Sequence, residues 1–137
     1  PWEMKDYVNS RVKFREEFRP FAPAVLKEFC SDFFDIKQES PHMLIAVEAK
    51  HENKNKIAAT VHSDNSSRVQ TVGKNDNLRF WNLLNSFYDK TGVPVLLNTS
   101  FNVKGQPVVN SPVEAINTLQ STNIDCLVIG DFIVDSM

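Results

Sequence analysis

Polar side chains gather between Leu97 and Pro107, directly after the apolar run Val93 to Leu97. This composition predicts a buried strand that ends in a polar loop, and open α/β sheets bind ligands at such strand ends. Amide and hydroxyl groups both donate and accept hydrogen bonds, and Gly105 lets backbone N–H groups approach an anion. The alternative is a turn whose side chains only cap their own backbone. The candidate binding residues of the loop are Asn98, Thr99, Ser100 and Asn102.

A second cluster near the N-terminus is cationic and consists of Arg11, Lys13, Arg15 and Arg19. If residues 11–15 are extended, three of these cations share one face of a strand. Like charges on one face repel, but they become favourable around an anion, where each charge-assisted hydrogen bond contributes roughly 1.5–3 kcal/mol. The alternative is neutralisation by Glu16 and Glu17 in surface ion pairs of about 0–1 kcal/mol each.

A third segment, residues 61–72, is predicted to form a strand, a polar turn at residues 64–67 and a returning strand. It adds His62 and a further cation, Arg68, to the candidates. A metal site at His62 is not expected, because His42 and His51 have no ligand-like spacing to it. A hydrogen-bonding or structural role for His62 is expected instead.

The elements that must position these residues follow from hydrophobic periodicity, turn residues and caps. The predicted helices are residues 2–9, 26–34 and 78–88, with a fourth beginning at Ser111 and Pro112. Further strands are predicted at residues 43–49, 127–129 and 132–134. The aromatic residues of the 78–88 helix are expected in the core rather than on a ligand platform. We predict the α/β class, with a twisted mixed sheet and flanking helices.

Length and composition limit the class of protein further. With 137 residues, of which 42% are hydrophobic, one domain of residues 1–137 is expected. The net charge of −2 disfavours broad binding to nucleic acid or membrane. Cys30 and Cys126 have no disulfide or metal spacing, and no bilayer-spanning or signal segment is evident, which favours a cytoplasmic location. The chain begins at Pro1 inside a predicted helix, so a fragment of a longer protein is expected.

Taken in order, these segments resemble the C-terminal domain of the O-carbamoyltransferase family. That family includes nodulation-factor carbamoyltransferases and enzymes that carbamoylate aminoglycoside and cephamycin antibiotics. The matching stretches are residues 12–25, 62–72, 91–105 and 125–132. The resemblance implies a YrdC-like fold, whose members carry a Lys-x-Arg element, a following basic residue with Pro, and a Thr-Ser-x-Asn loop. Lys13, Arg15, Arg19 and the loop at Thr99 match these elements, whereas Asn65 replaces the family's turn glycine.

The resemblance further implies that carbamoyl phosphate and ATP with Mg²⁺ combine here to give carbamoyl-adenylate and pyrophosphate. An N-terminal domain that holds a metal ion and is absent from this chain would transfer the carbamoyl group to a hydroxyl of a sugar or small molecule. The expected catalytic cations are Lys13, Arg15, Arg19 and Arg68. The expected substrate and nucleotide ligands are His62, Asn98, Thr99, Ser100 and Asn102.

Two other functions stay open at this point. One is a non-catalytic YrdC-like module that binds nucleotide or RNA, and the other is an enzyme like threonylcarbamoyl-adenylate synthase. The amino-acid sequence of residues 18–23 and 98–102 fits the carbamoyltransferases better. We expect no transfer to an acceptor by this chain alone, no membrane partner and no metal site within it.

Overall fold

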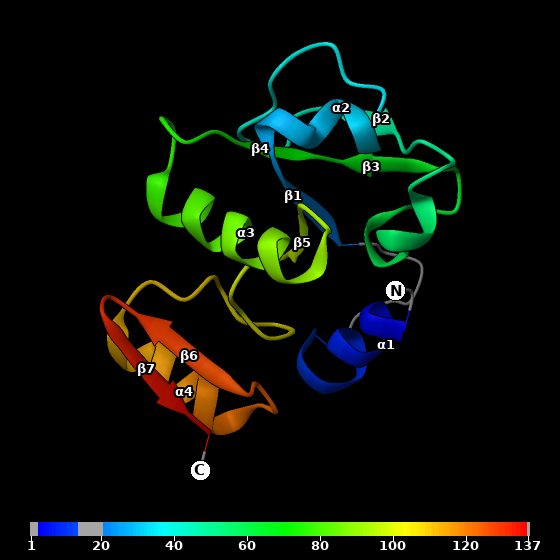
Figure 1. Cartoon of the computed structure of the whole chain (residues 1–137). Coiled ribbons are helices and arrows are strands. Elements are labelled where there is room, and N and C mark those ends of the chain that lie inside the picture. Colours follow the sequence, from blue (N-terminus) through cyan, green and yellow to red (C-terminus); the bar gives the residue numbers. More distant parts are fainter. Residues whose placement is uncertain (1–2, 14–20, 137) are drawn as a thin grey trace. The chain divides into compact units, whose positions relative to one another are not determined.

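The computed structural model describes residues 3–13 and 21–136 (Figure 1). The chain divides into two compact units, the first formed by Pro1–Lys5 and Phe18–Thr99, and the second by Asp6–Glu17 and Ser100–Met137. The predicted catalytic residues Arg15 and Arg19 lie outside the described residues. In the described part of the chain, every helix is too short or too polar to cross a bilayer.

The first unit is built on a three-stranded mixed sheet in the order β4-β1-β5. The strands are β1 (Ala22–Leu26), β4 (Gln70–Val72) and β5 (Val95–Asn98). The central strand β1 runs parallel to β4 and antiparallel to β5. Together with helices and further antiparallel pairs, this sheet confirms the predicted α/β class. The predicted strand before the polar loop is also confirmed, and Asn98 is its last residue.

The central strand β1 was not predicted, and the helix predicted over residues 26–34 is wrong at its start. Leu26 ends β1, and only then do a 3₁₀ turn (Lys27–Phe29) and the short helix α2 (Cys30–Phe33) follow. Proline conceals the strand, because a missing N–H normally excludes it from a central strand. Pro23 is tolerated where it pairs with Leu97 of β5 alone, since pairing with β4 begins one residue later, at Ala24.

Each face of this sheet has its own apolar cluster. Helix α3 (Leu78–Thr91) buries Leu84 against Ala24, Leu26 and Val72, and the aromatic side chains of Phe80, Trp81 and Tyr88 join them. The predicted core role of the helix's Phe80 and Tyr88 is thereby confirmed. In the other cluster, Val25, Val69 and Val95 pack with Cys30, Phe33 and Phe34. Burial raises the pKa of the Cys30 thiol to about 11.

Helix α3 begins at residue 78 as predicted and runs three residues beyond the predicted end at residue 88, and local signals set both ends. The side chain of Asn77 accepts from Phe80 N at 3.0 Å and caps the first turn. At the other end, Gly92 takes the left-handed conformation, with φ of 70°. Such a residue lets the chain leave the helix toward β5 without strain.

A second, smaller sheet in this unit pairs β2 (Ala46–Glu48) with β3 (Ser66–Arg68) in antiparallel fashion. The strand predicted over residues 43–49 is therefore confirmed only in its later part. The strand predicted to begin at residue 61 is wrong, because the 3₁₀ turn Ala58–Thr60 lies directly before it and the polar turn begins at His62. The predicted returning strand is divided in the structure, because β3 and β4 belong to different sheets.

A carboxylate holds the polar turn that leads into β3. Asp64 Oδ1 accepts from the hydroxyl of Ser66 at 2.7 Å and from its backbone N–H at 3.0 Å. Asn65 has a φ of 69°, a conformation that Asn tolerates better than most residues. The Ser66 hydroxyl and backbone N–H hold the pKa of Asp64 below its ordinary value, and His62 adds a smaller effect.

The second unit contains helix α4 (Pro112–Ser121) and the hairpin of β6 (Cys126–Ile129) and β7 (Phe132–Asp135) (Figure 1). Both the helix start and the two closing strands are confirmed. Ser111 Oγ accepts from Glu114 N and caps the first turn, and Glu114 Oε2 accepts from the backbone N–H of Asn110, the residue before the cap. Inside, Ala115, Leu119 and Leu127 form the core of the unit.

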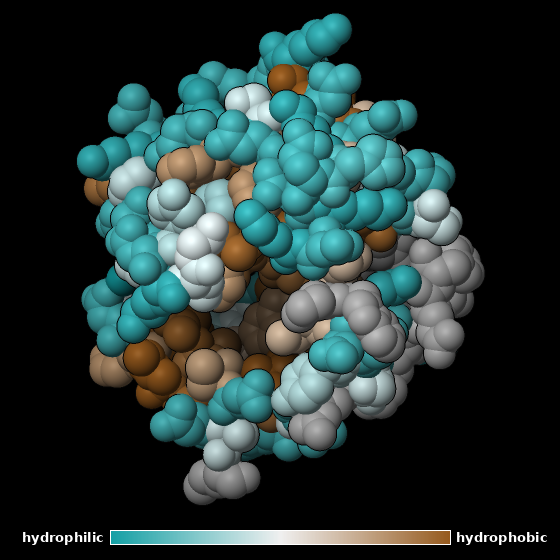
Figure 2. All heavy atoms as spheres, turned by 45° about the vertical axis from the view of Figure 1, so that its right-hand side comes forward, coloured by the Kyte–Doolittle hydropathy of each residue, from teal (hydrophilic) through white to brown (hydrophobic). Residues whose placement is uncertain are grey.

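The outer side of the β6–β7 hairpin is apolar and exposed. Val128 and Ile133 face each other across the hairpin and are 67% and 72% exposed. Figure 2 shows brown, hydrophobic surface in the lower part of its view, against teal over most of the rest. Cys126 also lies on β6, and its thiol is exposed.

The N-terminal segment is helical up to the last residue described before the gap. Helix α1 (Glu3–Val8), which confirms the predicted first helix, continues directly into a π-helix, Asn9–Lys13. The extended conformation considered for residues 11–15 is therefore wrong for residues 11–13. Three alternating positions are too few to distinguish a strand from the wide turn of a π-helix, which is rare and frequently found at functional sites.

Leu84→Ala should destabilise the protein by about 2–5 kcal/mol, because it empties a fully buried position between α3 and the sheet. The matched control is Leu83→Ala, since the neighbouring leucine is 58% exposed and should change the free energy of unfolding by about 0.5 kcal/mol or less. Urea unfolding of both variants measures the difference. Equal losses would contradict the packing described for α3.

Ser66→Ala should raise the pKa of Asp64 toward its ordinary value, because the hydroxyl makes the largest contribution to the lowered pKa. The pKa should stay below that value, since the backbone N–H bond remains. A lowered carboxyl pKa stabilises the folded state above the unfolded pKa, and this contribution is lost as the pH falls through the folded pKa. The variant should therefore lose less stability on acidification.

The pKa of Asp64 is measured by following its carboxyl resonance in an NMR titration. Ser63→Ala is the control, because Ser63 is exposed and makes no contribution to the lowered pKa. An unchanged pKa in Ser66→Ala would show that the hydroxyl does not stabilise the charged carboxylate.

Candidate functional site

Lys13 lies at the end of the π-helix and is only 5% exposed, which is unusual for a charged side chain. Its ammonium group donates to Ser100 O, to Asn102 O at 2.9 Å and to Asn102 Oδ1 at 2.9 Å, with Ser100 Oγ at 3.5 Å. All of these residues belong to the second unit. Three of the predicted site residues are thus brought together, although 87 and 89 positions separate the lysine from its partners.

The loop around Lys13 is an ordered polar turn. Ser100 Oγ donates to Asn102 Oδ1 at 2.7 Å, and Asn102 Nδ2 donates to Gln106 O at 3.0 Å. Val109 N closes the loop onto Phe101 O at 2.9 Å. The loop therefore caps its own backbone, as the alternative interpretation had it, and it also surrounds a cation.

The oxygens that accept from Lys13 at these distances carry no formal charge. An ammonium group has three N–H bonds, and the loop supplies enough acceptors to occupy all of them. These hydrogen bonds hold the ammonium group in one place beside the loop. This arrangement can orient a loop and stabilise negative charge at the same time.

Asn9, four residues before Lys13, was missed by sequence reasoning. It is 7% exposed, and neither its Nδ2 nor its Oδ1 has a hydrogen-bond partner in the described structure. A buried amide left unpaired costs about 1–3 kcal/mol, so it is uncommon in folded proteins. An Asn within a short helical segment gives no sequence signal of this kind, because exposed Asn residues look the same.

Asn98, at the end of β5, lies in a second group of polar contacts, within the first unit. Its Nδ2 donates to Gln70 Oε1 at 2.7 Å, and Gln70 Nε2 donates to Pro41 O at 3.1 Å. Gln70 was not among the predicted residues. The available signal was a long amide placed between Val69 and the Thr71–Val72 end of an otherwise apolar run.

Arg68 is exposed and donates from Nη2 to Met43 O at 3.2 Å. Met43 has a φ of 55°, a left-handed conformation that is uncommon for a residue other than Gly, Asn or Asp. Such strain costs of the order of 1–3 kcal/mol and persists only where the surroundings enforce it. The guanidinium keeps further N–H donors, because it carries five in total.

The remaining predicted residues have simpler surroundings. His62 is half-buried in the polar turn, where its backbone N–H donates to Ser66 O at 2.8 Å, and Thr99 is half-buried after β5. Within residues 3–13 and 21–136, no group of three His, Cys, Asp or Glu side chains could hold a metal ion. The roles assigned to His62, Thr99 and Arg68 stay predictions, as do those of the undescribed Arg15 and Arg19.

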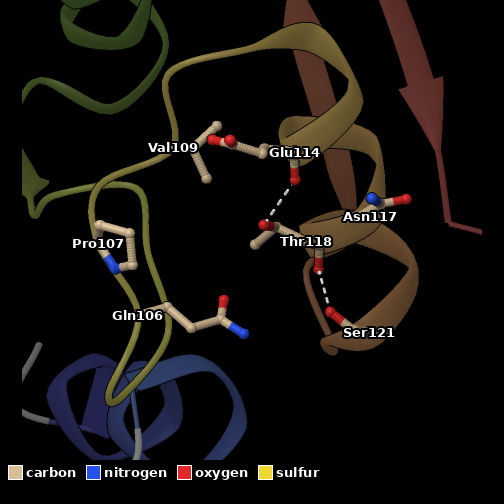
Figure 3. A pocket seen from close by; sticks show the side chains of 7 residues that line it. All are labelled: Gln106, Pro107, Val109, Glu114, Asn117, Thr118 and Ser121. Carbon is tan, nitrogen blue, oxygen red and sulfur yellow. Dashed lines mark hydrogen bonds between the residues drawn. The ribbon is translucent and has the colours of Figure 1, made fainter.

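A pocket of about 300 Å³ lies in the second unit, between the segment after Gly105 and helix α4 (Figure 3). Its lining residues are Gln106, Pro107, Val109, Glu114, Asn117, Thr118 and Ser121. The hydroxyls of Thr118 and Ser121 donate to backbone oxygens of the helix. The charged group among the lining residues is the Glu114 carboxylate, which disfavours an anionic ligand here.

Comparison with known proteins gives the same family along nearly the whole chain. The chain is 42% identical to the nodulation protein NolNO of Sinorhizobium fredii and 41% identical to the nodulation protein NolO of Bradyrhizobium diazoefficiens, over 98% of its length in both cases. It is also 34% identical to an uncharacterized protein of Methanocaldococcus jannaschii, again over 98% of its length. It spans 20%, 25% and 26% of these relatives, respectively.

The family model described as carbamoyltransferase C-terminus matches residues 2–136. Both clusters of contacts described above, around Lys13 and around Asn98, fall inside this match. This chain belongs to the carbamoyltransferase C-terminus family.

Proposed function

We propose that this chain is the part of a carbamoyltransferase that forms carbamoyl-adenylate from carbamoyl phosphate and ATP with Mg²⁺. The observation that carries the proposal is the buried Lys13, held by Ser100 and Asn102 within a chain of this family. A buried cation held in place by several hydrogen bonds suits chemistry in which negative charge moves between phosphate groups.

The proposed reaction has two bond changes at phosphorus. First, the oxygen of a water molecule attacks the phosphorus of carbamoyl phosphate, the bond from that phosphorus to the carbamoyl oxygen breaks, and orthophosphate and carbamate are released. A carbamate oxygen then donates an electron pair to the α-phosphorus of ATP, and the bond from that phosphorus to the oxygen bridging to the β-phosphate breaks. The electron pair of the broken bond leaves with pyrophosphate. The products are carbamoyl-adenylate, pyrophosphate and orthophosphate.

In this proposal Lys13 acts in two ways. Its hydrogen bonds hold the Ser100–Asn102 turn in one geometry before the substrates arrive, so less ordering is needed in the transition state. Its charge stabilises the oxygens on which negative charge increases as pyrophosphate leaves. Arg15, Arg19 and Arg68 are proposed as further phosphate ligands. The pocket beside helix α4 is not assigned to phosphate, because the Glu114 carboxylate would repel a phosphate group.

The transfer of the carbamoyl group to an acceptor hydroxyl is assigned to the part of the protein outside this chain. The relatives are about four to five times longer, which leaves room for a second, metal-bearing site. We place the reaction in the cytoplasm, where ATP is available. Membrane and nucleic acid have no part in it.

Lys13→Met should lower pyrophosphate release by about a hundredfold when carbamoyl phosphate and ATP with Mg²⁺ are supplied to the full-length protein. The side chain keeps its length but loses the charge that the transition state needs, and a loss of this size is typical when one oxyanion donor is removed. Affinity for ATP should fall much less, since the contribution is made mainly in the transition state.

Lys90→Met is the control, because Lys90 is an exposed lysine near the end of α3. Thermal unfolding is recorded for both variants, so that a loss of folded protein is not counted as a loss of chemistry. A folded Lys13→Met protein with normal pyrophosphate release would defeat the catalytic assignment of this lysine.

The same assay separates the two other functions considered from the sequence. ATP binding without pyrophosphate release by the wild-type protein would indicate a binding module. Pyrophosphate release that requires threonine and bicarbonate instead of carbamoyl phosphate would indicate a threonylcarbamoyl-adenylate synthase. The match to the carbamoyltransferase family supports carbamoyl phosphate as the substrate.

A further inference from the structure

Two amide side chains from the outer strands of the main sheet meet across the central strand. Gln70 is the first residue of β4 and pairs with Ala24 of β1, whereas Asn98 is the last residue of β5 and pairs with Ala22 of β1. Asn98 Nδ2 nevertheless donates to Gln70 Oε1 at 2.7 Å. We call this contact, with the bond from Gln70 Nε2 to Pro41 O, the amide relay.

The relay depends on small residues beneath it. Ala22 and Ala24 are two positions apart on β1, so they share a face of the sheet with their partners Asn98 and Gln70. The two outer strands are separated by two strand spacings, about 9–10 Å, which the side chains must cross. Alanine leaves that path open, and glutamine supplies the length that a shorter amide lacks.

The Pro41 carbonyl, at one end of the relay, fixes the orientation of both amide side chains. The carbonyl of Pro41 can only accept, so Gln70 must turn its Nε2 toward it and its Oε1 toward Asn98. Asn98 must then present Nδ2 to Gln70, because two oxygens would repel. The acceptor Oδ1 of Asn98 is thereby directed away from Gln70, and it has no hydrogen-bond partner among the described residues.

The loop that contains Pro41 is itself tied down. Arg68 Nη2 donates to Met43 O, two residues further along, and Met43 is held in its left-handed conformation. Thr71 N donates to Ser40 O at 3.0 Å, and Ser40 N donates to Thr71 Oγ1 at 2.8 Å. Hydrogen bonds to Ser40 and Met43, on either side of Pro41 in the sequence, therefore hold the Pro41 carbonyl in place.

We propose that Gln70 is a positioning residue that presents Asn98 Oδ1 as an acceptor for the amino group of the carbamoyl substrate. This assignment rests on the proposed function. Phosphate oxygens cannot meet this atom favourably, because both are acceptors. The carbamoyl amino group is the donor that distinguishes carbamoyl phosphate from other acyl phosphates, so the relay selects the substrate.

The test compares the binding of carbamoyl phosphate with that of acetyl phosphate, in which a methyl group replaces the amino group. The wild-type protein should bind carbamoyl phosphate about three- to tenfold more tightly, as expected for one neutral hydrogen bond. Gln70→Met keeps the length of the side chain but frees the Asn98 amide to turn, so the ratio should fall to about one. Asn98→Ala should give the same ratio.

Gln70→Glu should keep the preference, because a carboxylate oxygen still accepts from Asn98 Nδ2, even if its charge weakens binding of both phosphates. Asn85→Ala is the matched control, since Asn85 also makes one side-chain hydrogen bond, to Asp89 on α3. A folded Gln70→Met protein with the wild-type ratio would overturn the positioning role. Equal binding of both ligands by the wild type would overturn the substrate assignment but not the proposed function.

A measurement without ligand tests the amide relay separately from the substrate assignment. In the wild type, NMR should show Asn98 side-chain amide protons that are protected from exchange, and Gln70→Met should remove that protection. Unprotected Asn98 protons in the wild type would overturn the relay itself. A protected relay in a protein that binds neither acyl phosphate would defeat the proposed function and the substrate assignment together.

Discussion

The burial of one ammonium group constrains much of the second unit. Removing Lys13 from water is costly unless its N–H bonds are satisfied, and the Ser100–Asn102 turn satisfies them with backbone and side-chain oxygens. The same contacts, together with the packing of Phe101 against the core of the second unit, hold the turn in one conformation. Cation and loop therefore order each other, and neither geometry would persist unchanged without the other.

In the first unit, the polar groups that are held in place are neutral amides rather than a charged group. There the regular sheet brings Gln70 and Asn98 to opposite edges of β1, and hydrogen bonds between neutral amides fix which atom points where. Neutral pairs of this kind contribute modestly to stability, but they determine direction unambiguously. In the second unit tertiary contacts place a charge, whereas in the first unit they orient a neutral acceptor.

Sequence patterns predicted the regular parts of this fold well. Helix α3, helix α4 with its Ser111 cap, the β6–β7 hairpin and strand β5 all follow from periodicity and local caps. Strand β1 could not be predicted, because Pro23 contradicts the usual pattern and only the long-range register with β4 and β5 accommodates it. Lys13, Ser100 and Asn102 were predicted as candidates, but their mutual contact depends on tertiary structure. Gln70 and Asn9 carry no distinctive local signal, since their importance comes from partners, or the lack of them, far along the chain.

The two cysteines differ in a way that experiments can use. Burial at the start of α2 keeps the Cys30 thiol protonated at neutral pH, because it raises the pKa to about 11, whereas Cys126 is exposed on β6. Alkylating reagents attack the thiolate, so the folded chain offers them essentially one reactive sulfur. A fluorophore or spin label would therefore attach at Cys126 without any cysteine having to be removed, and it would report on the second unit.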